Sequence, residues 1–536
     1  MSASHYAPAG ALDHKKKLKG AILARMGEEI GSIDKDAPEA VALVYPSPYR
    51  VGMSSLGYQT IYRSINATEG RAAHRAFLPD DIGVWKQSRT PLVTYEKLRP
   101  VSDYPVIALS VAYEAELAGV IQVLELAGIP PLAEDRTRQH PFILAGGPLT
   151  FSNPLPLAPF VDAMIMGEAD QSVHTALSVI FGSESKDSAM RTLSGQPHVF
   201  VPSAHGDILP PIDKADTTTL PAFSQIITPN TELRNMFLIE PERGCHRGCT
   251  YCVMRRSTND GMRVVKKERI LSLIPGHAKK VGLVGAATTD HPQIVDVVNA
   301  LADSGREVGL SSLRADRLND ELVAALRKGG HRTLTTASDG SSQRMRDFIQ
   351  RRTSEEQLRQ AAKLARRHGM KRLKLYIMVG IPGETDDDID ELIEFGKELS
   401  TLIPLSLGVA PFVAKRNTPL DGAAFAGMPL VESRLRRLRR GVQGRVDVRA
   451  TSARWAWVEY VLAQGGRAEG LAVLDAVHAG GRFSDWKRAF NALPEGRPRR
   501  LLVRPSDRLG RASQPAPASR SGSKPPRRPS RGSGSG

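Results

Sequence analysis

The stretch Arg243-Gly-Cys-His-Arg-Gly-Cys-Thr-Tyr-Cys252 contains every cysteine of a chain of 536 residues. Its thiols, Cys245, Cys249 and Cys252, are spaced C-x3-C-x2-C. Thiolate is a soft ligand that suits zinc and iron–sulfur clusters. Because all the thiols of the chain are gathered in one short stretch, the sequence predicts a single metal site.

Other uses of these cysteines fit the pattern less well. A structural disulfide would pair two thiols and leave the third alone. A zinc site takes four ligands, usually in two separated pairs, whereas His246 lies between two of the cysteines and no second pair follows. A cubane iron–sulfur cluster usually takes four thiolates, so three would leave one iron with an open position for a substrate or cofactor. The pattern favours such a cluster.

Strand and helix patterns alternate around the cysteine stretch. Apolar strands are predicted over 236–240, 281–285, 307–313, 333–337, 372–380 and 404–410. Helices are predicted over 292–302 and 319–328, from a capping box at 353–356 to Gly369, and from Thr385 onward. Six such units predict a partial (β/α)6 barrel. Barrels present catalytic residues at the C-terminal ends of their strands, which is where the cysteine stretch lies.

The cysteine spacing, the aromatic Tyr251 before the last cysteine and the preceding strand resemble the radical S-adenosylmethionine (SAM) superfamily. The resemblance implies that Cys245, Cys249 and Cys252 hold a [4Fe-4S] cluster whose open iron chelates the amino and carboxylate groups of SAM. The reduced cluster would split the sulfonium and release a 5′-deoxyadenosyl radical. It also implies that Tyr251 lies near the adenine and that an electron donor such as flavodoxin or ferredoxin is a partner.

Residues at the other strand ends resemble the positions with which this family contacts SAM. They are Gly285 and Ala286 after the second strand, Ser312 and Arg314 after the third, Asp339 after the fourth, and Gly380, Ile381 and Gly383 after the fifth. The second-strand segment is degenerate, so its contact with the amino group would use backbone carbonyls. The fork of Arg314 suits a carboxylate, and glycines let a backbone pass close to an adenine edge. Asp339 could hold a ribose or act as an ordinary helix N-cap.

The N-terminal third has a different pattern. Strands are predicted over 41–45, 106–111, 142–147 and 163–167, with helices over 54–67, 114–127 and 171–181. Strand runs that are apolar on both faces and separated by helices predict a doubly wound, Rossmann-like parallel sheet. Ligands of such sheets bind beyond the carboxyl ends of the strands.

Residues 40–185 resemble the cobalamin-binding domain that precedes many radical SAM barrels, in a poorly characterised subgroup. The stretches that carry the resemblance are 45–57, Ala145-Gly-Gly-Pro148 and Met166-Gly-Glu-Ala-Asp170. The usual D-x-H-x-x-G segment with its cobalt-ligating histidine is absent, because no histidine occurs between Tyr45 and His74. Two expectations stay open: cobalamin binds without a histidine ligand, or the domain is a vestigial scaffold.

The charge of the chain is concentrated at its end. Of a formal net charge of +16, the segment 497–536 contributes eleven Lys or Arg against one acid, Asp507. Its richness in Pro, Ser, Gly and Arg predicts disorder, and a solvated extension is favoured over binding to RNA or membrane. No secretory signal and no apolar run of ~18 residues is present, so we expect a cytoplasmic protein without a membrane span.

These patterns divide the chain into six predicted segments. They are an N-terminal extension over 1–39, the cobalamin-binding-like domain over 40–185, a linker over 186–235, the barrel over 236–410, a cap on the open barrel over 411–490 and the basic tail over 497–536. Within the cap, a basic helix over 432–440 carries Arg434 and other arginines, which would be solvated or contact phosphate.

We therefore expect a radical SAM enzyme of unknown substrate, with cobalamin-dependent methyl transfer as one reaction open to it. A methylthiotransferase that modifies tRNA or protein is the alternative enzyme, although it would need a second cluster and further cysteines, which the chain lacks. A non-catalytic zinc or cluster protein whose tail engages nucleic acid is the alternative from another class.

Overall fold

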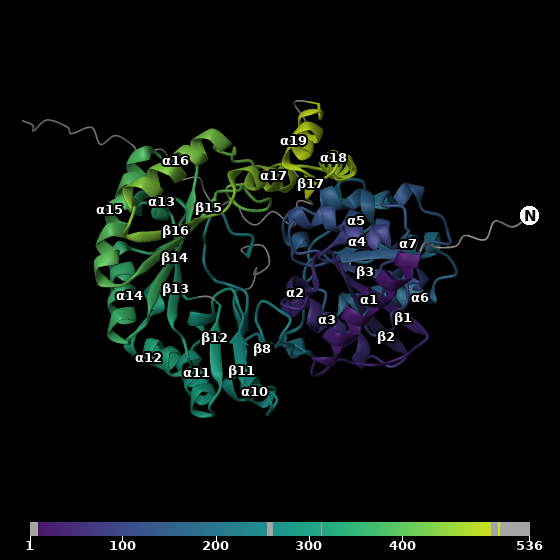
Figure 1. Ribbon diagram of the computed structural model, residues 1–536, viewed down its shortest axis with the longest axis horizontal. Coiled ribbons are helices and arrows are strands. Elements are labelled where there is room, and N and C mark those ends of the chain that lie inside the picture. Colours follow the sequence, from purple (N-terminus) through teal and green to yellow (C-terminus); the bar gives the residue numbers. More distant parts are fainter. Residues whose placement is uncertain (1–8, 255–260, 312, 495–501, 504–536) are drawn as a thin grey trace, which may run out of the picture.

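The computed structural model describes residues 9–254, 261–311, 313–494 and 502–503. The chain forms two α/β units that lie side by side (Figure 1). This mixed α/β architecture with parallel sheets confirms the predicted fold class.

The first unit is built on a six-stranded sheet in the order β2-β1-β3-β4-β5-β6, parallel except for β6. Its strands are β1 (Glu39–Tyr45), β2 (Arg71–Phe77), β3 (Val106–Ser110), β4 (Phe142–Gly146), β5 (Ala163–Ile165) and β6 (Val199–Phe200). The strand order reverses direction between β1 and β3, which is where doubly wound sheets open a ligand crevice.

The helices of the first unit are α1 (Ala9–Gly27), α2 (Tyr49–Gly52), α3 (Leu56–Ala67), α4 (Ile82–Gln87), α5 (Leu117–Leu126), α6 (Ser172–Gly182), α7 (Lys186–Ser194) and α8 (Pro202–His205). The helix predicted over 114–127 begins as a 3-10 turn, η2 (Glu114–Glu116), and continues as α5. Helix α7 and strand β6 extend this unit into residues that the sequence analysis assigned to a linker.

Strand β2 is not predicted by apolar patterning, because three of its seven residues are Arg71, His74 and Arg75. All its side chains are buried, and the charged ones have partners. The Arg75 guanidinium lies 2.7 Å from Glu29 Oε2 and 2.5 Å from Glu96 Oε1, with both carboxylates almost fully buried. Apolar patterning cannot find a strand whose buried charges are neutralised by residues distant in the sequence.

We predict that Arg75→Met destabilises the protein by about 3–5 kcal/mol, because it leaves two buried carboxylates without their counter-ion. Arg50→Met is the matched control, since Arg50 and Asp80 form an exposed pair whose loss should cost under about 1 kcal/mol. Urea unfolding followed by circular dichroism measures both. Equal losses for the two variants would contradict the structural role given to Arg75.

The second unit is an open barrel of parallel strands. Its two sheets have the orders β12-β11-β8 and β13-β14-β15-β16 and are linked by a bridge between Leu313 and Thr336. The strands are β8 (Met236–Ile239), β11 (Lys280–Leu283), β12 (Glu307–Leu310), β13 (Thr333–Asp339), β14 (Arg372–Val379), β15 (Leu405–Pro411) and β16 (Val446–Ala450). The six predicted strands are confirmed, and β16 adds a seventh from the segment expected to form the cap.

Helices cover the outside of the barrel (Figure 1). They are α10 (Lys267–Ser272), α11 (Ile294–Asp303), α12 (Asp320–Lys328), α13 (Gln343–Phe348), α14 (Glu355–Arg367), α15 (Asp386–Leu402) and α16 (Met428–Gly441). The predicted capping box of α14 is present, but it is shifted by one residue to Ser354 and Gln357. The acids after Thr385 begin α15 as expected.

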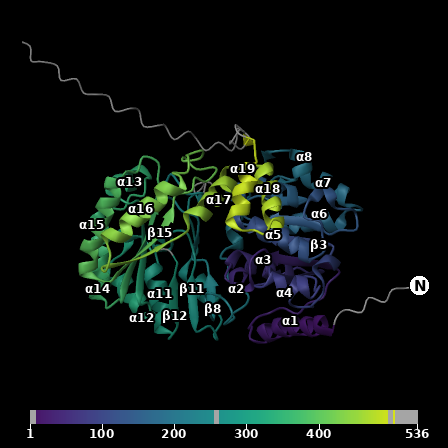
Figure 2. The same ribbon diagram turned by 45° about the horizontal axis from the view of Figure 1, so that its top comes forward.

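The last three helices, α17 (Ala453–Gln464), α18 (Arg467–His478) and α19 (Phe483–Asn491), differ from the expected barrel cap. Val458, Val473 and Trp486 belong to the hydrophobic core of the first unit, and Figure 2 shows α18 in front of α5. These helices therefore pack mainly on the first unit, while Ala453 at the start of α17 belongs to the core of the barrel. Strand β17 (Leu502–Val503) pairs with β7 (Ile208–Leu209), and the rest of the predicted tail lies outside the described residues.

A strap after β15 joins the two units. The Lys415 ammonium lies 2.7 Å from both Glu114 of the first unit and Glu459 of α17. The Asn417 amide donates to the carbonyls of Phe151 and Ser152, at 3.3 and 2.8 Å. These contacts hold the carboxyl ends of both sheets toward each other. Among the helices that the structure describes, none has the length and apolar character needed to cross a bilayer.

Candidate functional site

The cysteine stretch forms a loop at the mouth of the barrel. It begins after the two-residue strand β9 (Glu242–Arg243), which pairs with β10 (Arg263–Val264). Gly244 has a φ of 103°, a conformation that favours glycine. Farther along, the Thr250 N–H donates to the Ile349 carbonyl at 3.0 Å, and the Thr250 carbonyl accepts from the Leu420 N–H at 3.2 Å. The loop is thus fastened to the barrel on two sides.

The three thiols on this loop form no disulfide. Cys249 is buried, and Cys245 and Cys252 are half-buried. Burial raises the pKa of Cys252 to about 11, and the pKa of Cys245 is also raised by burial, with the charge of Cys249 adding to both shifts. The negative charge of one thiolate therefore disfavours ionisation of the others. A cationic metal cluster bound to all three would offset this repulsion between thiolates.

The described residues contain no group of three or more His, Cys, Asp or Glu side chains arranged around a single metal ion. His246, which a zinc site would require as a fourth ligand, is half exposed, and its Nε2 lies 3.6 Å from Asp290 Oδ2. A cluster, by contrast, distributes its thiolates over several irons. The donor set fits a three-thiolate cluster better than a single zinc ion.

Tyr251 and Asp339, which the sequence analysis selected separately, meet in the structure. The Tyr251 hydroxyl donates to Asp339 Oδ2 at 2.6 Å, and Arg351 Nε lies 2.9 Å from the same oxygen. Burial raises the pKa of Tyr251, and the charge of Asp339 raises it further, so the phenol stays protonated as the donor. Asp339 has a φ of 61°, which is unusual for a non-glycine residue. Asp339 therefore fastens the cysteine loop to the end of β13.

The end of β11 brings Gly285 and Ala286 beside a residue that the sequence analysis missed. Glu242 is fully buried, and its Oε1 accepts from the Ala287 N–H at 2.8 Å. A Cβ at position 285 would lie 2.1 Å from that oxygen, so the Glu242 carboxyl would have to move if another residue replaced this glycine. Burial raises the pKa of Glu242 to about 8. No sequence pattern signals this carboxyl, because its environment comes from another strand.

Arg314, expected to face a ligand carboxylate, is buried and bound to carboxylates of its own chain. Its guanidinium contacts Asp290 and Asp316. Asp316 also binds Arg247 of the cysteine loop at 2.5 Å. A ligand carboxylate would therefore meet a guanidinium that already has two partners. Ser312, predicted beside it, lies outside the described residues.

The glycine turn after β14 is organised by Glu384, whose carboxylate is buried. Gly380 and Gly383 have φ of 83° and 78°, and Ile381 is buried between them. Glu384 accepts from the Gly380 N–H at 2.6 Å and from the Ser341 hydroxyl at 2.6 Å, and it pairs with Arg434 at 2.9 Å. The expectation that Arg434 would be solvated or contact phosphate is wrong, because it is the buried counter-ion of this carboxylate.

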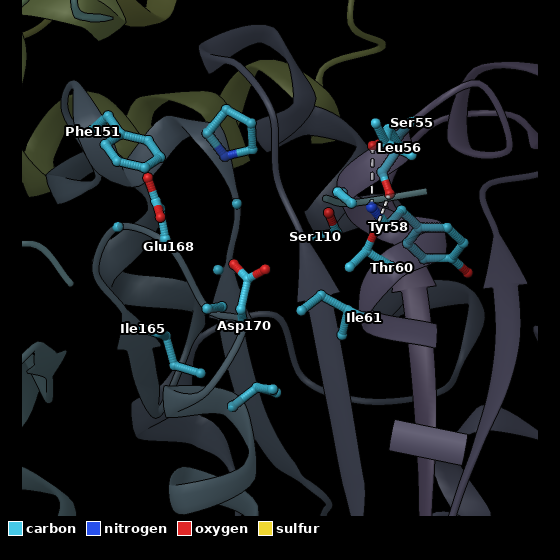
Figure 3. Close-up of a pocket in the computed structure, with 18 of the residues that line it drawn as sticks. Ser55, Leu56, Tyr58, Thr60, Ile61, Ser110, Phe151, Ile165, Glu168 and Asp170 are labelled. Atoms are coloured by element: carbon cyan, nitrogen blue, oxygen red, sulfur yellow. Dashed lines mark hydrogen bonds between the residues drawn. The ribbon is translucent and has the colours of Figure 1, made fainter. Parts of the chain in front are cut away.

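A cavity of about 570 Å³ lies between the two units, at the carboxyl ends of β1, β3 and β4. Figure 3 shows Ser55, Tyr58, Thr60 and Ile61 on one side of it and Phe151, Glu168 and Asp170 on the other. The barrel contributes Gly244 and Met254 from around the cysteine loop and Gly285 and Ala286 from the end of β11. The size and mostly apolar lining are those of a ligand pocket. No histidine is among its described lining residues.

Gly146 and Gly147, from one of the stretches that carry the resemblance, line this cavity. Gly147 has a φ of 109°, and a Cβ there would lie 2.6 Å from the Val111 carbonyl. Gly146 differs, because a Cβ there would meet nothing closer than 3.9 Å. The backbone thus needs glycine at 147, whereas at 146 glycine leaves space in the cavity.

Arg243 joins the cysteine loop to the charged part of the cavity lining. Its guanidinium binds Glu240 at 2.8 Å, Glu168 at 3.2 Å and Asp170 at 3.0 Å. Arg263 binds Glu168 from the adjacent strand. Three carboxylates and two guanidiniums thus form a polar, charge-paired patch at one side of an otherwise apolar cavity.

Comparison with known proteins agrees with this architecture. The model for radical SAM proteins, N-terminal, matches residues 57–202, and the radical SAM superfamily model matches residues 239–396. Together the two matches cover more than half of the chain. The chain belongs to the radical SAM superfamily. It is therefore an enzyme of the family whose members use a [4Fe-4S] cluster and SAM.

Two relatives of this radical SAM enzyme are archaeal. An uncharacterised protein of Methanocaldococcus jannaschii is 28% identical, over 72% of this chain and 80% of the relative. An uncharacterised methyltransferase of Pyrococcus horikoshii is 22% identical, over 49% of this chain and 59% of the relative. The descriptions of these two proteins state no substrate.

Among solved structures, the cobalamin-dependent SAM radical enzyme OxsB, with aqua-cobalamin and SAM bound, is 12% identical with a TM-score of 0.46. The match covers 76% of this chain and 56% of that chain. A similarity this low does not show that this radical SAM enzyme binds the same ligands as OxsB.

We predict that Tyr251→Phe lowers the free energy of unfolding by about 1.5–3 kcal/mol, since it removes a partly buried hydrogen bond to a charged carboxylate. Tyr113→Phe is the control, because Tyr113 is exposed, and it should change stability by less than about 0.5 kcal/mol. Thermal unfolding of the two variants gives the comparison. A Tyr251→Phe protein as stable as the Tyr113→Phe protein would show that the link to Asp339 does not hold the loop.

Proposed function

We propose that this radical SAM enzyme binds a [4Fe-4S] cluster through Cys245, Cys249 and Cys252 and cleaves SAM reductively at the barrel mouth, beside a cavity that holds a second ligand. The observation that carries the proposal is the position of the cysteine loop. The only thiols of the chain lie on one fastened loop, and that loop borders the cavity between the units.

When bound, the cluster supplies the electron for SAM cleavage. An external donor such as flavodoxin or ferredoxin would deliver that electron. Tyr251 would lie along the adenine, and Gly380, Ile381 and Gly383 would pass its edge, since their turn is fixed by Glu384. Gly285 and Ala286 would face the amino group of SAM. Asp339 would reach the ribose while it keeps the Tyr251 phenol in place.

The mostly apolar cavity serves the same chemistry by excluding water. A reactive intermediate formed at the barrel mouth is protected from side reactions when apolar walls surround it. Both units contribute to these walls, so a ligand in the cavity would lie directly beside the SAM-binding side of the barrel. Positioning of this kind is the main contribution that a protein makes when cofactors carry the hard chemistry.

We propose cobalamin as the second ligand and methyl transfer as the reaction. The cavity opens at the strand-order switch of the first unit, where such sheets bind ligands. Asp170 and Glu168 could accept hydrogen bonds from the amide groups around a corrin ring. The described lining has no histidine, so the cobalt would lack an imidazole ligand from this cavity. A relative described as a methyltransferase, at 22% identity, agrees with this reaction.

The alternatives explain less of the site. A methylthiotransferase with a second cluster would need thiols that the chain does not have. A zinc protein would need a fourth ligand, and the nearest histidine, His246, is directed to Asp290. Neither alternative gives a role to the cavity.

For the metal, we predict that Cys249→Ala abolishes iron and sulfide uptake on anaerobic reconstitution, since a cluster with two remaining thiolates is poorly held. His246→Ala is the matched control and should bind as much iron as wild type. Iron and zinc analysis with absorption spectra measures this, and circular dichroism shows whether the barrel stays folded. Loss of metal in His246→Ala, or zinc in a colourless wild-type protein, would contradict the cluster.

For the cavity, we predict that Gly146→Leu weakens hydroxocobalamin binding by about tenfold or more, because the new side chain occupies ligand space without a backbone clash. Gly276→Leu is the control, since a Cβ there meets nothing within 4 Å and Gly276 is not among the cavity residues. Equilibrium dialysis measures binding. A wild-type protein without cobalamin affinity would make the first unit a scaffold or a substrate site, while cluster chemistry would be untouched.

A further inference from the structure

The inner face of the four-stranded barrel sheet carries an exposed aromatic ring. Alternate residues of β14, from Leu373 to Val379, are buried in the barrel core, and Figure 1 shows α14 and α15 on the outer side of the sheet. Because successive side chains of a strand point to opposite faces, Tyr376 faces the inside of the barrel. This residue is 46% exposed. An aromatic ring that stays open on such a face offers a surface on which a planar group can stack.

The neighbouring strands leave room for this ring to lie against the sheet. Tyr376 stands in register between Ala337 of β13 and Gly408 of β15. A Cβ at position 408 would lie 2.9 Å from Cδ1 and 3.0 Å from Cε1 of the ring, so one edge of the ring lies over the glycine. The Lys374 ammonium donates to the Tyr376 hydroxyl at 3.0 Å and lies 4.6 Å from the ring centroid. The ring is therefore held near the strands while much of it stays open.

Positive charge surrounds this ring. The charged residues of β14, β15 and β16 are Arg372, Lys374, Asp447 and Arg449. All four share the face of Tyr376, because the valines of β16 pack on the opposite side against the barrel core. Asp447 accepts from Arg449 at 2.9 Å and from Arg372 at 3.4 Å, so three cations share one carboxylate. The Arg449 side chain is 68% exposed. This face is therefore complementary to an anion.

The same face leads to the cysteine loop. Met378, two residues after Tyr376 on β14, packs against a small hydrophobic cluster around Phe412. Tyr251 of the cysteine loop packs against that same cluster. Two residues of a strand span roughly 7 Å. A molecule stacked on the ring would therefore lie one residue pair along the strand from the side chains that adjoin the cysteine loop.

We propose that the inner face of β13 to β16 binds the substrate of the enzyme, and that this substrate is a small planar molecule with a carboxylate or phosphate group. Its ring stacks on Tyr376, and its anionic group binds Arg449 and Lys374. The assignment rests on the proposed function, because it places the bound molecule beside the SAM at the barrel mouth. Tyr376 and the two cations are then substrate-binding residues.

The test uses small probes on the reconstituted enzyme, kept oxidised and saturated with SAM so that the SAM site is filled. Phenyl phosphate and benzoate combine a ring with an anion. Inorganic phosphate and acetate supply the anion alone, and benzamide supplies a neutral ring. Titration calorimetry measures the dissociation constants. We expect phenyl phosphate or benzoate to bind about fivefold or more tightly than its bare anion and than benzamide, since stacking adds to the ionic contact.

Variants separate the two contacts. Tyr376→Leu should weaken binding of the preferred ring-bearing anion about fivefold and leave its bare anion unchanged. Arg449→Gln should weaken both about tenfold, because it removes a charged donor. Tyr113→Leu and Arg436→Gln are the matched controls and should change neither, since both residues are exposed and lie outside this sheet.

Three results would overturn the assignment: no ring-bearing anion binds more tightly than its bare anion; Tyr376→Leu and Arg449→Gln bind the probes as wild type does; or the control variants lose as much affinity. If Tyr376→Leu fails to fold by circular dichroism, Gly408→Ala replaces it, since its Cβ would displace the ring and should give the same selective loss. A cluster-loaded protein that fails to bind SAM would refute the proposed function, whereas a SAM-bound protein that binds none of the probes would refute this substrate site alone.

Discussion

The contact of Arg243 with three carboxylates is the interaction on which the site depends. Arg243 directly precedes Gly244 and the first cysteine, and its guanidinium reaches Glu168 and Asp170 of the other unit. The charges are largely buried, so each needs its partners to stay in place. Because one residue belongs to both the cysteine loop and the cavity lining, the position of the thiols relative to the first unit is fixed electrostatically.

The remaining contacts extend this constraint around the barrel mouth. Asp339 ties Tyr251 to β13, Glu384 ties the glycine turn after β14 to α16, and Glu242 supports the end of β11. Glu384 and Glu242 are buried and Asp339 is half-buried, and each organises backbone at a strand end. A chemistry that depends on radicals needs such rigidity, since small displacements of reacting groups are costly in rate. These carboxylates therefore serve to hold the loops of the barrel mouth in place.

The sequence predicts those elements whose structure depends on residues close together in the chain. The runs of Val, Ile and Leu that form β1, β3, β4 and the barrel strands are apolar whatever surrounds them, and the cysteine spacing is legible in isolation. Prediction fails where partners come from far away. Strand β2 was missed because Glu29 and Glu96 neutralise its Arg75. Arg434 was misplaced because its counter-ion lies in another segment, and Glu242 carried no signal at all.

The same reason explains the helices α17 to α19. Their pattern predicts helices, but it does not say which unit they cover, and the structure packs them mainly on the first unit, with Ala453 of α17 in the barrel core. The strap at Lys415, which follows the last central strand of the barrel, then joins the barrel to Glu114 of the first unit and to Glu459 of α17. Sequence patterns alone do not show that C-terminal helices pack on the N-terminal unit, so domain boundaries drawn from them miss this arrangement.

The central claim is that this loop supports reductive cleavage of SAM. The most direct measurement is the yield of 5′-deoxyadenosine, by chromatography and mass spectrometry, after anaerobic reconstitution with iron and sulfide and reduction by dithionite in the presence of SAM. The account predicts 5′-deoxyadenosine in proportion to the cluster content. A protein that carries a full complement of cluster and binds SAM, yet releases no 5′-deoxyadenosine on reduction, would contradict it.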